Sequence, residues 1–552
     1  MLRAKPRNFS IGSRGVEGVA TRMTGRDAEL EALQAAYHRL FAERILTAVT
    51  VVAEAGIGKS RLLYGFEAWS EARSESFFLF RGRATPAIGT QAFGLLRDIV
   101  AWRFQINDDD SIEAAHRKTE DGIVPLLLHD DGPDLAQAHA HAHLLGHLIG
   151  IEWRGSRYIR GILDDPRQIR NRAFHAAAQL FRRVSASDGS PVVLQPEDLH
   201  WADSESLDFL NYLTEVNRDV PLLVLGFTRP ALFEQRPDWS STEGLHTRID
   251  LAPLDKRASR DLANELLKKL PEIPAALREL LIGSAEGNPF YMEELLRMLI
   301  DQSAIQTGQT DGAWKVNAER LLVTHLLPML TGVLQARLDG LPAPEKRALQ
   351  QASVVGAVFW DQALAAVEPQ AAEQLPALVQ RELTLPRAGV REYAFRHQVL
   401  YQVAYNTVLE RDTREGHAKV AQWLAGLAEQ GSLRAGDFLG LAAEHFEQAA
   451  DGANAAEFHA RAAEHAGQRM AHDRVLVHVG RALALLGAAQ ADPPIHPTPR
   501  APSGPPAQTK LRWRLLSARE QTPSLQARRD EQVANLDALE QLADGRRRAE
   551  VA

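Results

Sequence analysis

The segment Ala53–Ser60, AEAGIGKS, has the residue types and spacing of a loop that binds phosphate groups. It matches the pattern G-x-x-x-x-G-K-[ST] at every fixed position except the first, where alanine replaces glycine. The two glycines would let backbone N–H groups point inward around phosphate oxygens, while the lysine supplies a cation and the serine a hydroxyl for Mg²⁺. The predicted nucleotide contacts are Ala55, Gly56, Ile57, Gly58, Lys59, Ser60 and Arg61, with Ser60 also a metal ligand.

Two acidic residues, Glu197 and Asp198, follow a later apolar run in VVLQPEDLHWAD. One carboxylate, which we assign to Glu197, can hold Mg²⁺ through water, and the other can orient or activate the attacking water. However, Gln195 and Pro196 stand directly before the acids, and proline cannot donate a ladder hydrogen bond in a central strand. We therefore expect an interrupted strand here, so that the sequence supports nucleotide binding more firmly than hydrolysis.

The elements that must position these residues alternate along the first part of the chain. Strands are predicted at ILTAVTVVA, FFLFRGRA, PVVLQPED and PLLVLGFT, with helices between them. This alternation predicts an α/β domain with a mostly parallel sheet. Beyond Arg229 helices bounded by proline dominate, and residues 436–486 have the Ala-rich spacing of antiparallel helices in a repeat array.

Composition excludes several other classes of protein. The chain has 552 residues and a net charge of −8, which gives no broad electrostatic reason to expect nucleic acid or an anionic membrane as a partner. It has no cysteine, so disulfides and thiolate metal sites are excluded. No apolar run approaches the roughly 20 residues that span a bilayer, and the N-terminus lacks the apolar centre of a secretion signal. We expect a cytoplasmic protein with no direct nucleic-acid site and no membrane contact.

A group of histidines in AHAHAHLLGHLIG raises the question of a metal site. His143 and His147 have the i, i+4 spacing that can share a metal on one helical face, and His139 and His141 precede them. The sequence shows no third ligand. An amphipathic helix with partly exposed histidines is therefore the favoured interpretation.

Taken together, the motifs resemble the STAND group of P-loop ATPases within the AAA+ class, and in particular the Orc1-like ATPase and repeat modules found behind bacterial class III adenylate/guanylate cyclase domains. The resemblance spans about residues 3–410 and is carried by RGVEGVATRMTGRDAEL, AEAGIGKSRLLY, RGILDDPRQIRNRA, EDLHWADSESLDFL, GFTRPALFEQRPDW, AEGNPFYMEELL, LTGVLQARLDGLP and FRHQVLYQVAY. It implies an α/β P-loop NTPase core with a parallel sheet, followed by an α-helical lid, a winged-helix-like region and tetratricopeptide-type α-helical repeats.

The resemblance also implies roles for residues outside the phosphate loop. Gly25 and Arg26 match the segment near the adenine, and Arg229 matches a phosphate-sensing arginine that we count with the two acids as catalytic. Pro289, which follows Asn288 in EGNPF, matches the lid element that packs on the base. His397 matches a position that contacts the ADP β-phosphate in related ATPases, although a histidine packed between helices is the more ordinary interpretation.

We expect the following organisation: a connector at 1–20, the P-loop ATPase core at 21–235, a helical lid at 236–305, a winged-helix-like helical domain at 306–430, tetratricopeptide-like repeats at 431–486, a Pro-rich linker at 487–510, and a terminal helical segment at 511–552 that resembles an interrupted repeat. The first residues, LRAKPR, resemble the end of a connector behind a cyclase domain. We therefore expect a shortened relative, or a gene product separated from its cyclase.

The resemblance implies a slow ATPase that uses ATP and Mg²⁺ as a conformational switch and relays the change through its helical repeats to a protein partner. A nucleotide cyclase domain is one candidate partner, but the chain itself is not expected to be a cyclase. The alternative is an interaction scaffold that binds ATP without hydrolysing it and is stabilised by the bound nucleotide.

Overall fold

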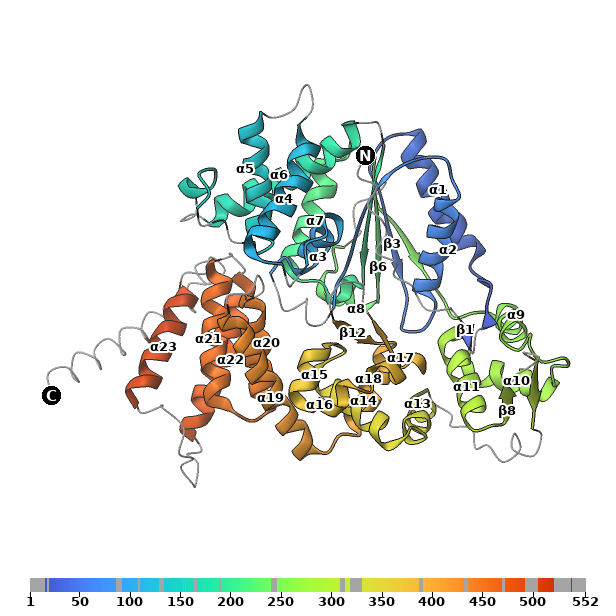
Figure 1. The fold of residues 1–552 in the computed structure, drawn as a ribbon. Coiled ribbons are helices and arrows are strands. Elements are labelled where there is room, and N and C mark those ends of the chain that lie inside the picture. Colours follow the sequence, from blue (N-terminus) through green and yellow to red (C-terminus); the bar gives the residue numbers. More distant parts are fainter. Residues whose placement is uncertain are drawn as a thin grey trace.

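The computed structural model has a five-stranded sheet with helices on both faces, and further helical layers beyond one end of the strands (Figure 1). The structure describes residues 15–16, 19–85, 92–107, 110–128, 134–151, 153, 155–162, 166–187, 190–239, 246–307, 313–317, 330–386, 391–430, 435–468, 472–491, 505–520 and 538.

The strands of this sheet are all parallel, and their order in space is β4-β5-β6-β3-β7. Their bounds are β3 Thr47–Val52, β4 Phe78–Arg83, β5 Val192–Glu197, β6 Leu222–Thr228 and β7 His246–Asp250. Because β6 pairs with both β3 and β5, the carboxyl ends of these three strands lie side by side at one edge of the sheet. The α/β core with a parallel sheet that the sequence predicts is confirmed.

Both faces of the sheet are buried, as expected for parallel strands. Val49 and Val193 belong to the apolar cluster under α1 and α2, whereas their neighbours Ala48 and Leu194 belong to the cluster under α3, α6 and α7. Figure 1 shows these two helical layers on opposite sides of the strands. The helices are α1 Asp27–Ala42, α2 Lys59–Glu71, α3 Gly94–Phe104, α6 Pro166–Ser187 and α7 Ser204–Val216.

Between α3 and α6 the chain forms a helical insertion that stands away from the sheet (Figure 1). It contains α4 Ile112–Leu127, α5 Leu135–Leu148 and a 3-10 turn at Arg160–Ile162. Side-chain oxygens cap both helices, since Ser111 accepts from the N–H of Ala114 and Asp134 from that of Gln137. These caps set where α4 and α5 begin and therefore which of their residues face each other.

After β6 come the short helix α8 (Ala231–Gln235) and a second compact unit. This unit consists of α9 Lys256–Leu266, α10 Ala275–Ala285, α11 Pro289–Asp301, and the antiparallel pairs β1 Gly15–Val16 with β2 Val19–Ala20 and β8 Ile305–Thr307 with β9 Trp314–Val316. These elements share one apolar cluster that includes Val16, Leu295 and the fully buried Trp314. Residues close to the N-terminus thus pack against the lid helices.

The next unit combines helices with a three-stranded antiparallel sheet in the order β10-β12-β11. Its elements are α13 Leu330–Asp339, α14 Ala343–Val355, β10 Val358–Trp360, α15 Asp361–Val367, α16 Pro369–Ala372, α17 Leu375–Gln380, β11 Thr384–Pro386, β12 Glu392–Phe395 and α18 Gln398–Asn406. Its apolar cluster continues without a break into the helices that follow.

The last described part is an array of neighbouring helices (Figure 1). The helices are α19 Glu410–Glu429, α20 Ala435–Gln448, α21 Gly452–Gln468, α22 His472–Ala491 and α23 Pro505–Glu520. Alanines fill the seams between them, for example the fully buried Ala442, Ala455 and Ala463. Small side chains allow the close helix packing that the sequence predicts for this region.

Two observed elements cross expected boundaries. The strand β7 lies in the segment expected to be lid, yet it is the edge strand of the core sheet and pairs with β3. It was missed because HTRID is short and polar, which suits an exposed edge. The helices α22 and α23 enter the two ends of the segment expected to be a Pro-rich linker, at Ala491 and Pro505.

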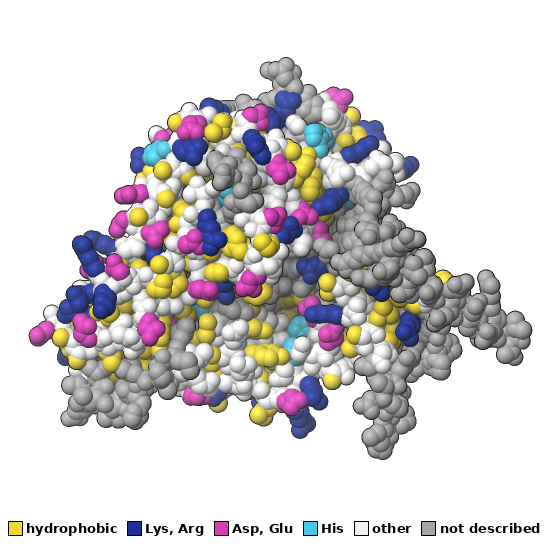
Figure 2. All heavy atoms as spheres, turned by 180° about the vertical axis from the view of Figure 1, so that it is seen from behind, with side chains coloured by type: hydrophobic (Ala, Val, Ile, Leu, Met, Phe, Trp, Pro, Cys, Tyr) yellow, Lys and Arg dark blue, Asp and Glu magenta, His cyan; other side chains and the backbone are white. Residues whose placement is uncertain are grey.

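The surface and the helices show no membrane-spanning feature within the described ranges. None of the described helices is both long and apolar enough to cross a bilayer. On the face shown in Figure 2, acidic, basic and apolar side chains are interspersed, and the described residues there form no broad field of one charge.

Candidate functional site

The phosphate-binding motif forms the turn between β3 and α2, at the carboxyl edge of the sheet. Gly56 and Gly58 have φ values of +82° and +111°, a backbone conformation that glycine adopts far more readily than other residues. Gly58 is also the N-cap of α2, so the N–H groups of the first helical turn point toward this turn. Ala53, in contrast, is buried and is not among the residues with positive φ, so its methyl group introduces no strain.

Lys59, the first residue of α2, directs its ammonium group back over the turn. The group donates to the carbonyl oxygens of Ala53, at 2.5 Å, and Glu54, at 3.2 Å. Burial lowers the pKa of Lys59 to about 8, partly offset by the negative charge of Asp198. Among the described residues Lys59 has no carboxylate within ion-pair distance, so its charge remains available to an anionic ligand.

Both acids lie at the end of β5, which continues through Pro196 to Glu197. The expected interruption of this strand is therefore wrong. Beyond Leu194 the strand pairs only with β4, and Pro196 falls in this singly paired stretch, where a missing N–H costs less than in a strand paired on both sides. Asp198 follows with a φ of +54°, an unusual conformation for a residue other than glycine and one that often marks a functional turn.

An arginine pair on β4 contacts the two acids. Arg83 Nε donates to Asp198 Oδ2 at 2.7 Å, and Arg81 Nε lies 3.4 Å from Glu197 Oε1. Burial alone would raise the pKa of Asp198, but Arg83, His200 and Lys59 together lower it. Asp198 is therefore ionised at neutral pH and faces the phosphate loop, whereas Glu197 is held by Arg81, which also contacts Glu67 of α2.

His200 completes this edge of the site. It is 5% exposed, and neither ring nitrogen has a hydrogen-bond partner among the described residues. Burial lowers the pKa of His200 to about 4, with the positive charges of Arg229, Lys59 and Arg83 acting in the same direction and Asp198 against it. The imidazole is therefore neutral at physiological pH, with one donor and one acceptor free for a ligand or water.

Arg229 directly follows β6, between the strand of the phosphate loop and the strand of the acids. Its charge acts on both Lys59 and His200, and its Nε has no hydrogen-bond partner among the described residues. The structure thus brings Lys59, Asp198 and Arg229 together from three adjacent strand ends.

Gly25 and Arg26, expected near the adenine, connect the core to the lid. Arg26 is buried and donates through Nη2 to the carbonyl oxygens of Ile57, at 3.0 Å, and Ala252, at 2.6 Å. Gly25 has a φ of +62°, and a Cβ there would lie 2.4 Å from the Cβ of Ala258 in α9. Arg26 thus joins the phosphate loop to the segment after β7, and Gly25 lies against α9.

The lid reaches the phosphate loop through the start of α11. The N-cap residue Asn288 donates from Nδ2 to the carbonyl oxygen of Ala55 at 3.3 Å and accepts from the N–H of Tyr291. Pro289 occupies the first helical position, where a missing N–H is tolerated. The next residue, Phe290, donates its N–H to the carbonyl oxygen of Gly56 at 3.4 Å.

His397 packs on Phe290, the residue that hydrogen-bonds to the phosphate loop. Its ring centroid is 3.5 Å from that of Phe290, so the unit of residues 330–406 packs directly on the start of α11. Burial lowers the pKa of His397 well below its ordinary value, and Arg396 and Arg297 act in the same direction. The neutral imidazole of His397 thus connects the unit of residues 330–406 to the phosphate loop through Phe290.

Ser60 and Arg61 occupy the next two positions of α2. Ser60 is exposed at the start of the helix, where its hydroxyl can serve a metal at the phosphate loop. The guanidinium of Arg61 donates to the carbonyl oxygen of Thr21, so this side chain contacts the N-terminal segment.

Sequence reasoning missed Arg81, Arg83 and His200. Their signal was present, because the alternating arginines end a strand next to the acids and His200 stands two residues after Asp198. Ligands of open α/β sheets bind beyond the carboxyl ends of the strands, so every polar residue at such an end is a candidate. What the sequence could not supply was the strand order that makes β4 the neighbour of β5.

Fold and site together define a nucleotide-binding α/β core of the phosphate-loop type. Residues 22–225 match the family model described as the AAA ATPase domain. This part of the chain is therefore similar to that domain, in agreement with the P-loop ATPase resemblance of the sequence.

Individual relatives cover more of the chain. An uncharacterized protein of Rhizobium meliloti (strain 1021) is 25% identical over 418 residues, which are 73% of this chain and 36% of that protein. The chain thus spans about a third of the length of the curated relative it matches.

Among solved structures, a STAND protein with a tetratricopeptide repeat sensor from Pyrococcus horikoshii aligns with 97% of this chain and 66% of its own, at 12% identity and a TM-score of 0.44. The Orc1 protein of Aeropyrum pernix, in complex with DNA, aligns with 71% of this chain and 94% of its own, at 11% identity and a TM-score of 0.32. Because both TM-scores are low, the fold assignment rests on the strand order of the chain itself and on the matched family model.

Proposed function

We propose that the chain is an ATP-dependent switch that hydrolyses ATP slowly and passes the change to a protein partner through its C-terminal helices. The observation that carries this proposal is the group of polar side chains at three adjacent strand ends. Lys59, His200 and Arg229 present charge or hydrogen-bonding atoms that the described protein residues leave uncompensated, as a site for a polyphosphate requires.

The residues of the site fit ATP with Mg²⁺. The turn at Gly56 and Gly58 and the ammonium of Lys59 would hold the phosphates, and the Ser60 hydroxyl would bind the metal. Magnesium would supply charge neutralisation at the phosphates. Asp198, ionised and close enough to Lys59 to affect its pKa, would orient water, and Arg229 would stabilise negative charge. Because Glu197 is bound by Arg81, its contribution to the metal would be less direct.

The contacts beyond the site support a relay. Glu294 of α11 accepts from Arg337 of α13 at 2.6 Å, and Glu382 binds both Arg297 of α11 and Arg396, the residue before His397. This buried ionic network joins the lid to the winged-helix-like region on the side where Phe290 meets the phosphate loop. Buried charge pairs tolerate little misalignment, so a shift of the lid should displace the adjoining unit.

The relay can continue into the helical array in two ways. The winged-helix-like region shares its apolar cluster with α19, α20 and α21. In addition, Asp437 of α20 lies 3.9 Å from Arg97 of α3, which connects the array to the core directly. We propose that the array has tetratricopeptide character and binds the partner, and that a nucleotide cyclase domain is one candidate for that partner.

Two variants test the function with the purified full chain. Lys59→Ala should weaken ATP binding by about 10- to 100-fold, as expected for losing a charge-assisted contact of roughly 1.5–3 kcal/mol. Asp198→Asn should retain ATP binding and lower single-turnover phosphate release by about 100-fold or more. Lys346→Ala, which removes a lysine paired with Asp339 far from the site in sequence, is the matched control. Undiminished phosphate release in Asp198→Asn would contradict the proposal.

A second function, the ATP-bound scaffold without hydrolysis, is favoured by one observation. Both acids are already bound by arginines of β4, most closely Asp198 by Arg83. If this pairing persists with ATP bound, neither carboxylate can activate water. Tight ATP binding by the wild-type chain, with no phosphate release in the presence of Mg²⁺, would support the scaffold.

A further inference from the structure

The two helices of the insertion bring together three side chains that the sequence did not connect. Glu120 of α4 meets His139 and His143 of α5, and one ligand atom from each lies within 4.8 Å of the other two. His143 Nε2 is 2.8 Å from Glu120 Oε1, and His139 Nδ1 is 3.4 Å from the same oxygen. Glu120 is therefore a third candidate ligand that the sequence alone did not reveal.

These distances are close to those of a tetrahedral zinc site. Zinc bonds to imidazole nitrogen and carboxylate oxygen of about 2.0–2.1 Å place neighbouring ligand atoms about 3.4 Å apart. The separation of His139 and Glu120 already has this value, and the separation of His143 and Glu120 requires only a small outward shift of the carboxylate. Glu120 is 32% exposed, so its side chain has room to move.

Neighbouring groups orient the buried histidine. The Nδ1 atom of His143 is 2.7 Å from the hydroxyl of Ser156, whose oxygen also accepts the N–H of Tyr158. A proton on Nδ1, donated to Ser156, leaves Nε2 as a lone-pair ligand that points at Glu120. Metal-binding histidines usually have such a partner on the other ring nitrogen.

Aromatic rings fix the planes of both imidazoles. The ring of His143 stacks on Trp153 at 3.6 Å between centroids, and that of His139 stacks parallel to Tyr158 at 5.8 Å. The two histidines are thus held in place before any ion binds.

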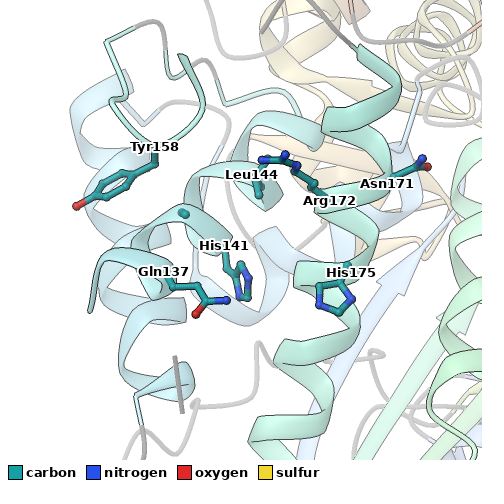
Figure 3. A pocket seen from close by; sticks show the side chains of 8 residues that line it. Gln137, His141, Leu144, Tyr158, Asn171, Arg172 and His175 are labelled. Atoms are coloured by element: carbon teal, nitrogen blue, oxygen red, sulfur yellow. The ribbon is translucent and has the colours of Figure 1, made fainter. Parts of the chain in front are cut away.

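The other histidines of α5 face elsewhere. His141 lies with His175 of α6 beside a pocket of about 370 Å³, which neither His139 nor His143 lines (Figure 3). Tyr158 borders this pocket and also covers His139. His147, one turn beyond His143, is not part of the three-ligand group. The pair His139–His143, rather than the pair His143–His147 that helical spacing also allows, is therefore the one that meets Glu120.

We propose that Glu120, His139 and His143 bind Zn²⁺ and thereby clamp α4 to α5. Three protein ligands of the type His₂Glu leave a fourth position, and the exposed side of the cluster, at Glu120 and His139, allows water or a partner's side chain to occupy it. The site lies in the insertion, apart from the nucleotide residues, and so does not depend on the proposed ATPase function.

The experiment uses the full chain, freed of metal with a chelator and kept without ATP or Mg²⁺. Zn²⁺ is titrated in competition with a chromophoric chelator, and Co²⁺ is added separately because its visible absorption reports low-coordinate nitrogen and oxygen ligation. We expect one high-affinity equivalent in the wild type, and added Zn²⁺ should slow hydrogen exchange in residues 112–127 and 135–148.

Variants then assign the ligands. His139→Gln and Glu120→Gln should each lower the affinity for the stoichiometric Zn²⁺ by more than about tenfold. Ser156→Ala removes only the partner of a ligand and should lower this affinity by about tenfold. His147→Gln is the matched control on the same helix and should stay within about twofold. Because His139 and Glu120 are partly exposed, these variants should fold, which circular dichroism without metal checks.

The proposal is overturned if the wild type binds no stoichiometric Zn²⁺ or if His139→Gln binds it as tightly as wild type. A loss in His147→Gln equal to that in His139→Gln would also overturn it, since the ion would then use the other helical pair.

Discussion

Two buried histidines in different regions of the molecule have opposite surroundings. His459, in the seam between α21 and α22, is fully buried and uses both ring nitrogens, with Nδ1 2.8 Å from His478 Nδ1 and Nε2 2.5 Å from Glu447. His200, at the carboxyl edge of the core sheet, is 5% exposed and uses neither among the described residues. Leaving a buried polar group unpaired costs about 1–3 kcal/mol. The paired imidazole of His459 avoids this cost and stabilises the array. The unpaired imidazole of His200 carries the cost in the free protein, which indicates that a ligand supplies its partner.

The charged residues of the same two regions differ in the same way. Arg514 of α23 is bound by Glu464 at 2.7 Å and by Glu457 at 2.9 Å, both on α21, so its charge is compensated within the array. Among the described residues, Lys59 donates to neutral carbonyl oxygens alone. The helical array therefore satisfies its own polar groups, whereas the core edge leaves them for something that binds there.

Within this comparison, the largest expected effect is that of His200→Leu. If the unpaired imidazole serves the reaction, phosphate release in a single-turnover assay should fall by about 100-fold, as for the loss of one preorganised hydrogen-bonding group. The stability of the nucleotide-free chain should remain the same or rise slightly, because an unsatisfied polar group is removed. A variant that melts at a lower temperature and retains full phosphate release would contradict this assignment, since His200 would then stabilise the fold as His459 does.

His459→Leu should give the opposite result. It leaves His478 and Glu447 without their partner, which should destabilise the array by about 2–3 kcal/mol while ATP affinity stays within about twofold. Hydrogen exchange of the amides in α21 and α22 measures the change locally. The double variant, with His459 and His478 both replaced by leucine, should recover part of this loss of stability, because no unpaired His478 remains. If the single and double variants lose the same stability, the unpaired His478 costs nothing, and the loss reflects only the change in side-chain size and shape.

The same pair predicts a dependence of stability on pH. Burial lowers the pKa of His478 to about 3, and it also lowers the pKa of His459, against the hydrogen bond to Glu447. Unfolded histidine titrates near 6.5, so the unfolded array binds more protons below that pH, and stability is complete above about 6.5 and falls toward pH 3.

For His478 the expected loss of stability between pH 7 and pH 5 is about 2 kcal/mol, and His459 acts in the same direction. Hydrogen exchange in α21 and α22, corrected for intrinsic rates, measures it. The slope should decrease in the double leucine variant, whereas the part due to His417 and His445, whose pKa values burial also lowers, should remain. A wild-type array equally stable at both pH values would contradict the assignment of neutral imidazoles.

The smallest expected effect belongs to the compensated charge of the array. Arg514→Met should destabilise α23 by less than about 1 kcal/mol, because the ion pairs are partly exposed and screened by solvent. The loss should shrink further at high salt. Hydrogen exchange of the α23 amides at two salt concentrations checks this. A loss of stability as large as that of His459→Leu would mean that partly exposed ion pairs stabilise the array as strongly as buried hydrogen bonds do.

Much of the nucleotide site could be predicted from local sequence. The spacing of Gly56, Gly58 and Lys59 specifies the backbone conformation and the ammonium group within a single turn, and the structure has both. The apolar runs before the loop, the acids and Arg229 are strong enough signals that all three strands were predicted, since buried parallel strands need apolar residues on both faces. The effect of Pro196 was misjudged because it depends on how far β6 extends beside β5.

What the sequence determined by itself is therefore set within a few neighbouring residues: the phosphate turn, the alternation of strands and helices, and the small-residue seams of the array. Only the tertiary structure decided which distant residues meet. It placed β4 beside β5 and so gave the acids their arginines, recruited the polar strand β7 to the sheet edge, and brought Glu120 to His139 and His143. The physical reason is that strand order and helix packing result from burying apolar area over the whole chain, so no local pattern records which side chains will share a site.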